Sequence, residues 1–234
     1  EVCGNHTDHN NGKVLAASIN LDAIAIAAKR DDMKINEKSE GHGLNEVDIS
    51  TLSPDEAEYG RSSSMIKGVA ARLKEKGYEI GGFDACTTSD VMGGSGLSSS
   101  AAFEVLIATV INHLYNDGKI DAVTVAKAAQ FSENVYFGKP SGLLDQMASS
   151  VGTFVTIDFK DTANPVIKKV DFDFAKSGYS LCIVDTHGNH SDLTDDYAAV
   201  RGEMEAVAKA MGKNVLREVE YEEFSKALMC LKKK

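Results

Sequence analysis

The chain has 234 residues, of which 43% are hydrophobic and 26% are charged, a composition typical of a globular protein with one large domain or two modest ones. Its net charge of -10 argues against a general nucleic-acid binder and against an anionic-membrane binder, because no basic stripe offsets the acidic residues. No apolar run approaches the length of a membrane span, and no signal-peptide pattern is visible.

The four cysteines lie far apart in the sequence, at positions 3, 86, 182 and 230, and form no CxxC pair. They therefore indicate neither a zinc site nor a redox motif, and a reduced, cytoplasmic location fits them best. The chain begins without methionine, in the middle of a pattern at Glu1, so we expect a fragment whose targeting information could have been lost.

The first half of the chain predicts strands followed by a helix. Residues 14–28 are apolar, with alanines set against isoleucines in alternation, which predicts paired strands. The polar stretch 30–63 predicts short strands and loops. Apolar residues then recur at helical spacing over 65–73, and Gly77 stands where a C-terminal cap belongs.

A second helix is predicted over residues 122–137, with Asp121 as its N-cap. Pro140 and Gly142 end it before a short helix that includes Asp145.

The remaining pattern mixes strands and helices. Alternation predicts a strand over 151–159, and the apolar run 181–184 predicts a second, more buried one. A long helix is expected over 194–211, ending at Gly212. Because helices and strands do not alternate as regular βαβ units, the sequence predicts an α+β protein.

Segment 93–102 is the most informative stretch, since three glycines and four serines lead directly into an apolar helical pattern over 103–114. Glycines let the backbone approach an anion closely, and the first N–H groups of a helix have no internal partner. Serine hydroxyls add donors and an oxygen ligand suited to Mg²⁺. The segment therefore predicts a phosphate-binding loop.

Two familiar phosphate loops do not match this segment. A Walker A loop ends in Gly-Lys-Ser/Thr, yet no lysine occurs between Lys76 and Lys119, and a dinucleotide fingerprint would need a glycine where Ser99 stands. A Gly/Ser linker is the alternative, although linkers rarely lead into a buried helix.

Three further segments accompany the loop: GNHTDH at 4–9, GLLDQ at 142–146, and residues 185–197. Together they resemble the galactokinases of the GHMP small-molecule kinase superfamily, over nearly the whole chain. The glycine loop alone is typical of the superfamily, whereas the first two segments are more specific to galactokinases.

The resemblance implies a GHMP kinase fold of the α+β class. Residues 1–160 would form an N-terminal domain similar to the ribosomal protein S5 domain 2-like fold, with the sugar and ATP motifs. Residues 161–234 would begin a second α+β domain that is incomplete. The implied activity is ATP-dependent phosphorylation of galactose at O1, the first step of galactose breakdown.

ATP and Mg²⁺ are the cofactors that the resemblance implies. Ser100 and Glu133 would hold Mg²⁺, and Glu133 stands twelve residues before Asp145, as in the family. Without the family, a solvated helix face is the alternative for Glu133. The residues that would wrap the triphosphate are Gly94, Ser95, Gly96, Leu97, Ser98, Ser99, Ser100 and Ala101.

Asp145 would be the catalytic carboxylate, which accepts or orients the proton of the anomeric hydroxyl while the oxygen attacks the γ-phosphate. From the residues alone, Asp145 could instead cap the short helix, and His6 could be a simple turn residue. The positions that the resemblance assigns to sugar binding are Asn5, His6, Asp8, Gly142 and Tyr197.

Several positions depart from the family pattern. Asn5 stands where the family usually has a glutamate, and Ser62 follows Arg61 where a tryptophan is common, so sugar and base recognition are less well specified. A kinase for a different sugar and a non-catalytic sensor of sugar and ATP therefore remain alternatives. A catalytic arginine and the third motif of the superfamily are absent from the chain, so we expect these 234 residues alone to have little or no kinase activity.

Overall fold

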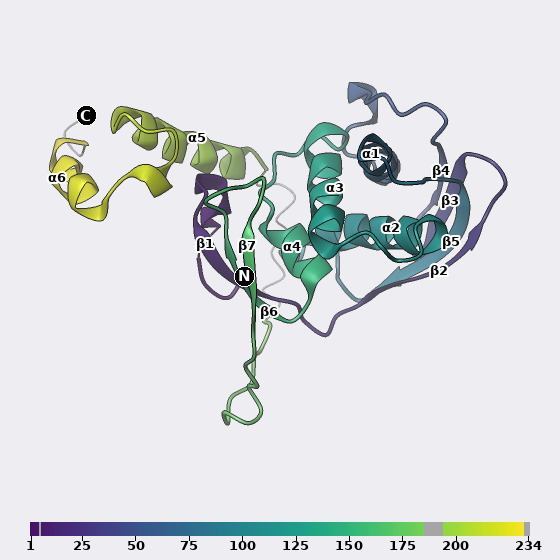
Figure 1. The fold of residues 1–234 in the computed structure, drawn as a ribbon, viewed down its shortest axis with the longest axis horizontal. Helices are drawn as coiled ribbons and strands as arrows, with labels where there is room; N and C mark the ends of the chain where they lie inside the picture. Colours follow the sequence, from purple (N-terminus) through teal and green to yellow (C-terminus); the bar gives the residue numbers. More distant parts are fainter. Residues whose placement is uncertain (5, 185–193, 232–234) are drawn as a thin grey trace.

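The computed structural model describes residues 1–4, 6–184 and 194–231, and it combines two β-sheets with helices packed beside them (Figure 1). None of the helices in these described ranges is long and apolar enough to cross a membrane. The elements in chain order are η1 (Thr7–Asn10), β1 (Lys13–Ala17), β2 (Ala23–Lys29), β3 (Lys34–Ser39), β4 (Leu44–Asp48), η2 (Glu56–Glu58), α1 (Ser62–Glu75), β5 (Phe83–Ser89), α2 (Ser99–Tyr115), α3 (Ala122–Val135), α4 (Leu144–Val151), β6 (Phe154–Asp158), β7 (Val166–Val170), α5 (Thr194–Ala210), η4 (Leu216–Glu218) and α6 (Tyr221–Leu231).

The four-stranded sheet has the order β2-β5-β3-β4, in which β3 and β5 are parallel and the other pairs antiparallel. Helices α1, α2 and α3 cover one face of it (Figure 1). Along β2, Ala23, Ala25 and Ala27 are half-buried while the isoleucines between them face outward, with Ile26 81% exposed. Small side chains therefore let the helix layer approach this strand closely.

The core of this half lies between the sheet and the three helices. Apolar residues of α1 and α2 contact alternate residues of β3, β4 and β5. Side chains on one face recur every three or four residues along a helix and every second residue along a strand. The largest fully buried side chains of this core are Phe83, Ile35, Ile49, Ile66, Leu73, Ile107 and Ile111. The predicted helices at 65–73 and 122–137 and the helical pattern after the glycine loop are confirmed.

Local caps set the ends of these helices as the sequence predicts. Asp121 accepts a hydrogen bond from the backbone N–H of Thr124 at 3.0 Å and so caps α3. At the end of α1, Gly77 has φ 85°, and the N–H of Tyr78 donates to the carbonyl of Leu73. This is the Schellman arrangement, which favours glycine because of the positive φ.

The three-stranded sheet is antiparallel throughout, with β6 between β1 and β7. Its inner face packs on α4 around Val155, Ile157 and Met147, which forms a second core. The expectation that residues 14–28 form strands that pair with each other is wrong in its pairing. The segment contains β1 and β2, but β1 pairs with β6 and β2 pairs with β5, so this stretch links the two sheets.

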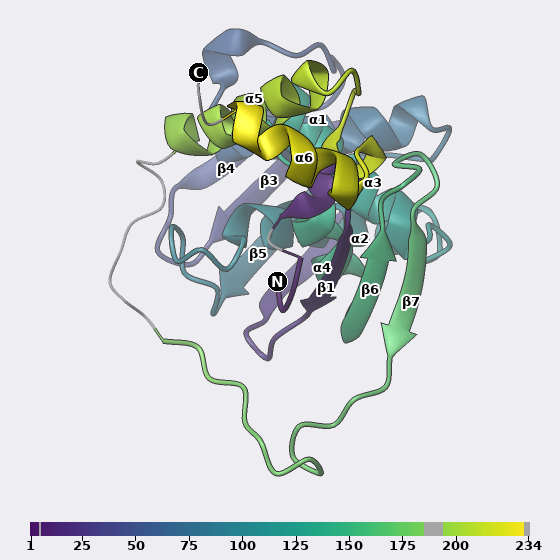
Figure 2. The ribbon, with the colours of Figure 1, turned by 90° about the vertical axis from the view of Figure 1, so that its left-hand side faces the viewer.

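The strand expected at 181–184 is not formed. These residues have no regular structure and are exposed. Figure 2 shows the chain after β7 running away from both sheets, and none of the described strands pairs with it. An apolar run needs a partner strand to satisfy its backbone groups. The strand that does extend the sheet is β7, which the sequence analysis did not identify.

The C-terminal helices lie at one end of the molecule, beside β1 (Figure 1). Helix α5 ends as expected before Gly212, whose φ is 71°. Polar contacts attach this part to the rest: Arg217 donates to both carboxylate oxygens of Asp158, at 2.8 and 3.2 Å, and the N–H of Leu216 donates to Asn10 Oδ1 at 3.1 Å. The mixture of elements confirms the predicted α+β class.

Candidate functional site

The glycine-rich loop bends sharply before it enters α2. Gly94, Gly96 and Ser98 have φ values of 72°, 75° and 62°, a conformation that glycine adopts without strain. Ser98 immediately precedes the first helical residue, Ser99, and its side chain makes no capping hydrogen bond. The first N–H groups of α2 are therefore left without a cap from Ser98, as an anion-binding helix terminus requires.

A cavity of about 400 Å³ connects this loop to the short helix α4. Gly96, Leu97 and Ser98 line it from the loop, and Asp145 lines it from α4. His6 and Glu1 close the side formed by the N-terminal segment, while apolar residues of α2 form another wall. The structure thus brings the predicted phosphate loop and the predicted catalytic carboxylate to one hollow.

Asp8 ties the N-terminal segment to the start of α4. Its Oδ2 accepts a hydrogen bond from the backbone N–H of Leu144 at 3.2 Å. A Cβ atom on residue 142 would lie 1.8 Å from the same oxygen, so Gly142 is required for this close approach. Asp8 Oδ1 is buried and has no partner in the described part of the chain, which suits it to accept a hydrogen bond from a bound hydroxyl.

His6 stands at the rim of the cavity in a left-handed conformation, with φ 53°. Its backbone N–H donates to Glu1 at 2.8 and 3.1 Å, while its ring is half-exposed and has Nδ1 3.8 Å from Asp8 Oδ1. Behind it, burial lowers the pKa of His9, against the opposing effect of the Asp8 carboxylate. His9 is therefore neutral at physiological pH.

Glu133 is the centre of the polar cluster behind the loop, with only 2% of its surface exposed. Ser100 Oγ donates to Glu133 Oε1 at 2.8 Å, so the two predicted metal ligands lie in contact. Lys139 Nζ lies 2.9 Å from the same oxygen, and Gln146 Nε2 donates to Oε2 at 2.6 Å. The alternative of a solvated helix face for Glu133 is wrong, because its carboxylate points into this cluster.

The donor set fits Mg²⁺ in its chemistry. Mg²⁺ prefers oxygen ligands and is commonly held by one or two carboxylates together with substrate phosphates. Ser100 and Glu133 supply a hydroxyl and a carboxylate oxygen in contact with each other. Within the described ranges, no cluster of three or more His, Cys, Asp or Glu side chains could hold a metal, and water or phosphate oxygens would occupy the remaining positions around the ion.

Two family models match the segments that build this site. The GHMP kinases N terminal domain matches residues 64–153, which include the loop, Glu133 and Asp145, and the galactokinase galactose-binding signature matches residues 1–29, which include His6 and Asp8. A galactokinase of Streptomyces coelicolor is 34% identical over 97% of this chain and 58% of its own length. The chain is thus similar to the galactokinases of the GHMP kinase superfamily over nearly its whole length.

Other galactokinases show similar likeness. A Clostridium tetani galactokinase is 31% identical, over 95% of this chain and 57% of its own length. The chain therefore spans somewhat more than half the length of the curated galactokinases that it matches.

Solved structures agree on the fold. A crystal structure of Lactococcus lactis galactokinase complexed with galactose superposes with a TM-score of 0.77 at 27% identity, covering 96% of this chain and 59% of that one. Methanococcus jannaschii mevalonate kinase shares the fold with a TM-score of 0.58 at 15% identity, over 73% of this chain and 53% of its own. The expected GHMP kinase fold is confirmed.

One buried carboxyl near Glu133 was missed by the sequence analysis. Glu104 on α2 is fully buried, and neither of its oxygens has a hydrogen-bond partner in the described part of the chain. Burial, and then the charge of Glu133, raise the pKa of Glu104 to about 10, so it is neutral at pH 7. The available signal was an acidic residue inside an otherwise apolar helix, between Phe103 and Val105.

Some predicted positions lie outside what the structure describes. Asn5 is one of them, and Tyr197 lies on the backbone of α5 with a side chain outside the described set. Arg61 and Ser62 are exposed at the start of α1, where Ser62 Oγ donates to Asn45 Oδ1 at 3.0 Å, and neither lines the cavity.

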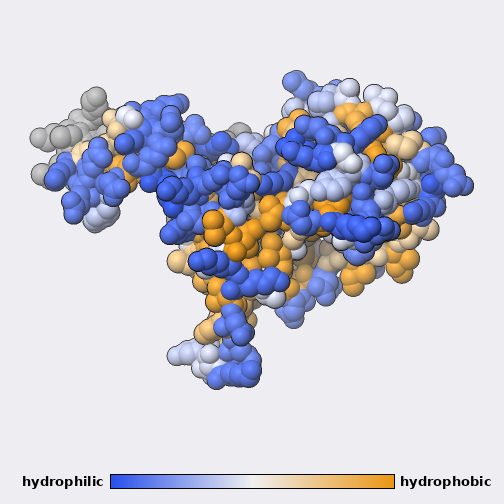
Figure 3. Space-filling model, in the orientation of Figure 1, coloured by the Kyte–Doolittle hydropathy of each residue, from blue (hydrophilic) through white to orange (hydrophobic). Residues whose placement is uncertain are grey.

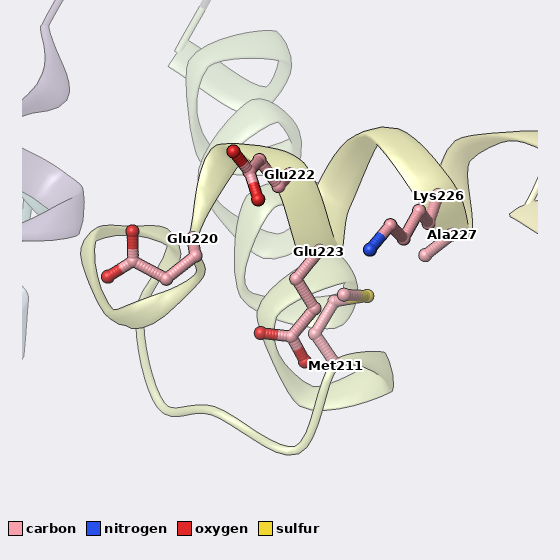
Figure 4. A pocket seen from close by; sticks show the side chains of 6 residues that line it. All are labelled: Met211, Glu220, Glu222, Glu223, Lys226 and Ala227. Carbon is pink, nitrogen blue, oxygen red and sulfur yellow. The ribbon is translucent and has the colours of Figure 1, made fainter.

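A second hollow, of about 560 Å³, lies between the end of α5 and α6 (Figure 4). None of the predicted site residues lines it. Its walls carry Glu220, Glu222 and Glu223 with Lys226 as the one basic residue among them, so its charge is unsuited to phosphate. The cavity lined by the glycine loop, His6 and Asp145 is therefore the candidate functional site.

Proposed function

We propose that the protein containing this chain transfers the γ-phosphate of ATP to O1 of galactose, with Mg²⁺ as the metal ion. The observation that carries the proposal is the cavity shared by the glycine loop, His6 and Asp145. Support also comes from the galactose-binding signature over residues 1–29 and from the likeness to a galactokinase solved with galactose.

The loop is proposed to bind the triphosphate of ATP. Positive φ values at Gly94, Gly96 and Ser98 turn the backbone, and the N–H groups at the start of α2 meet the phosphates along the favourable direction of the helix dipole. The residues proposed to wrap the triphosphate remain Gly94 to Ala101. Phosphoryl transfer depends mainly on alignment and on neutralising charge, which such a loop provides.

Asp8, His6 and Gly142 are proposed to bind the sugar. The unpartnered Asp8 Oδ1 is suited to accept a sugar hydroxyl, and Gly142 leaves room for the chain to pass this carboxylate. Asn5 and Tyr197 complete the proposed set. Paired donors and acceptors matter for a sugar, because each buried hydroxyl left unpaired costs about 1–3 kcal/mol.

Asp145 is proposed to hold the proton of the anomeric hydroxyl as its oxygen attacks phosphorus. Its position at the cavity wall, on the first turn of a helix that is fixed through Asp8, orients the carboxylate. Ser100 and Glu133 are proposed to hold Mg²⁺, which when bound neutralises phosphate charge.

Two further assignments accompany the proposal. The division into a domain at 1–160 and the start of a second at 161–234 places both family matches in the first part. A cytoplasmic location supplies ATP, and it agrees with the free thiols of Cys3, Cys86 and Cys182.

The proposal is tested by changing Asp145 to Asn in the complete protein. Turnover of galactose and ATP to galactose 1-phosphate, followed by ³¹P NMR, should fall by about 10²-fold or more. Binding of ATP, measured by calorimetry, should remain because the loop is untouched. An Asp161→Asn variant, altered on an exposed turn, serves as the matched control. Normal turnover by Asp145→Asn, or turnover of another sugar alone by the unaltered protein, would contradict the proposal.

A further inference from the structure

Lys139 is attached twice to the residue that carries the buried carboxylate. Its backbone N–H donates to the carbonyl of Glu133 at 3.0 Å, and its ammonium lies 2.9 Å from Glu133 Oε1. The carboxylate is buried, whereas the lysine side chain is 46% exposed. The turn after α3 thus places the half-exposed side chain of Lys139 against the buried carboxylate of Glu133.

The hydrogen bonds around Glu133 leave little room for a further cation at Oε1. A carboxylate oxygen offers two lone-pair directions, and Ser100 Oγ and Lys139 Nζ both contact Oε1. Oε2 accepts from Gln146. A metal ion that binds Ser100 together with Oε1 of Glu133 must therefore displace one of the present partners of that oxygen.

Lys139 is the partner that is free to leave. Ser100 is fixed in the first turn of α2, whereas Lys139 carries its charge on a long, half-exposed stem. An ammonium and a divalent cation on one oxygen would also repel each other strongly.

We propose that Lys139 is a built-in counter-cation for Glu133, which balances the buried carboxylate in the metal-free protein and gives way when a divalent cation binds. The inference rests on the proposed role of Ser100 and Glu133 as metal ligands. Lys139 accordingly lowers the affinity for the metal, because its ammonium competes with the ion for Glu133 Oε1.

The test measures Mn²⁺ binding to the full chain, in the absence of nucleotide, from the loss of the free-ion EPR signal. Lys139→Met should bind Mn²⁺ roughly tenfold more tightly than the unaltered chain, because the competing charge is gone. Lys139→Arg keeps the charge and should stay near the unaltered affinity. Lys119→Met removes a lysine from an exposed pair with Asp117 and is the matched control, with no change expected.

A second measurement separates competition from a purely structural role. Without metal, Lys139→Met should melt at a lower temperature than the unaltered chain, because Glu133 loses its counter-charge, and saturating Mn²⁺ should recover most of the loss. A structural role alone would lower the melting temperature and would not raise the affinity for Mn²⁺. Circular dichroism checks that each variant is folded.

The outcomes distinguish this inference from the proposed metal site. If Glu133→Gln abolishes Mn²⁺ binding while Lys139→Met leaves the affinity unchanged or weaker, the role of Lys139 is overturned and the metal site stands. If Glu133→Gln binds Mn²⁺ as the unaltered chain does, or if no variant binds Mn²⁺, the metal site and the inference fail together.

Discussion

The two ends of the molecule are held together by different forces. Residues 14–159 contain the two apolar cores, with fully buried side chains such as Phe83, Ile66 and Phe159. In the described part of the chain after Phe159, Ala208 is the one buried hydrophobic residue, and Tyr221 and Val200 are exposed. Figure 3 likewise shows the C-terminal helices largely covered by hydrophilic residues.

Because of this difference, the proposed phosphate-binding and catalytic residues are held more firmly than the segment that carries Tyr197. The phosphate loop, Glu133 and Asp145 belong to helices packed on the cores, which can hold a constellation rigidly. The segment that carries Tyr197 is attached mainly through polar contacts, such as the pair between Arg217 and Asp158. Phosphate binding should therefore survive perturbations of the C-terminal helices that weaken sugar binding.

The largest expected effect compares a leucine from each region. Leu73→Ala removes a fully buried side chain of the first core and should lower the free energy of unfolding by about 2–5 kcal/mol. Leu228→Ala, at a position 38% exposed on α6, should lower it by about 0.5 kcal/mol. Urea denaturation of both variants measures the difference. Equal losses would show that the C-terminal helices belong to the same cooperative core.

A second prediction uses the neutral carboxyl in the core. The folded protein raises the pKa of Glu104 from 4.5 to about 10, so the folded state holds a proton that the unfolded chain releases above pH 4.5. The contribution of Glu104 to the free energy of unfolding is complete below pH 4.5. It decreases by about 1.4 kcal/mol per pH unit as the pH rises toward 10. Glu104→Gln cannot ionise and removes that slope.

Denaturation at pH 5, 6.5 and 8 measures the effect. The stability of Glu104→Gln relative to the unaltered chain should increase steadily across this range. The amide leaves its own polar atoms unpaired, which adds a constant penalty but no pH dependence. A difference between the two proteins that does not change with pH would show that Glu104 is ionised in the folded state.

The smallest expected effect concerns the attachment of the C-terminal helices. The bond to Arg217 holds the pKa of Asp158 at about 2, so the pair is charged at neutral pH. Arg217→Ala should lower global stability by at most about 1 kcal/mol, because the pair is partly exposed. Hydrogen exchange should nevertheless accelerate in α5 and η4. Lys209→Ala, on the exposed face of α5, is the control, and equal exchange in both variants would mean that other contacts hold this part.

The sequence predicts those parts of the fold that local chemistry decides. Asp121 as a cap, Gly77 after α1 and the glycine loop before α2 all depend on residues within a few positions of each other. Strand pairing depends on distant partners, so the pairing of β1 with β6 was not predicted. The run 181–184 has the composition of a strand but pairs with none of the described strands, which no local pattern reveals.

In the candidate site, too, some features could be predicted from the sequence, whereas others depend on how distant segments pack. The resemblance to galactokinases implied that Ser100 and Glu133 would share a site, and the structure places them in contact. Burial decides the state of Glu104, and the fold of one turn decides the contact of Lys139 with Glu133, so neither could be predicted from residue spacing. The need for glycine at 142 arises from Asp8, which lies 134 positions earlier in the chain and accepts a hydrogen bond from Leu144.

The most direct measurement is a crystal structure of the protein with galactose, Mg²⁺ and a non-hydrolysable ATP analogue. We expect the terminal phosphates to lie on the N–H groups of residues 94–101 and the anomeric hydroxyl to lie within hydrogen-bond distance of the Asp145 carboxylate. A sugar bound outside the cavity that Asp145 lines, or phosphates away from the loop, would contradict this expectation.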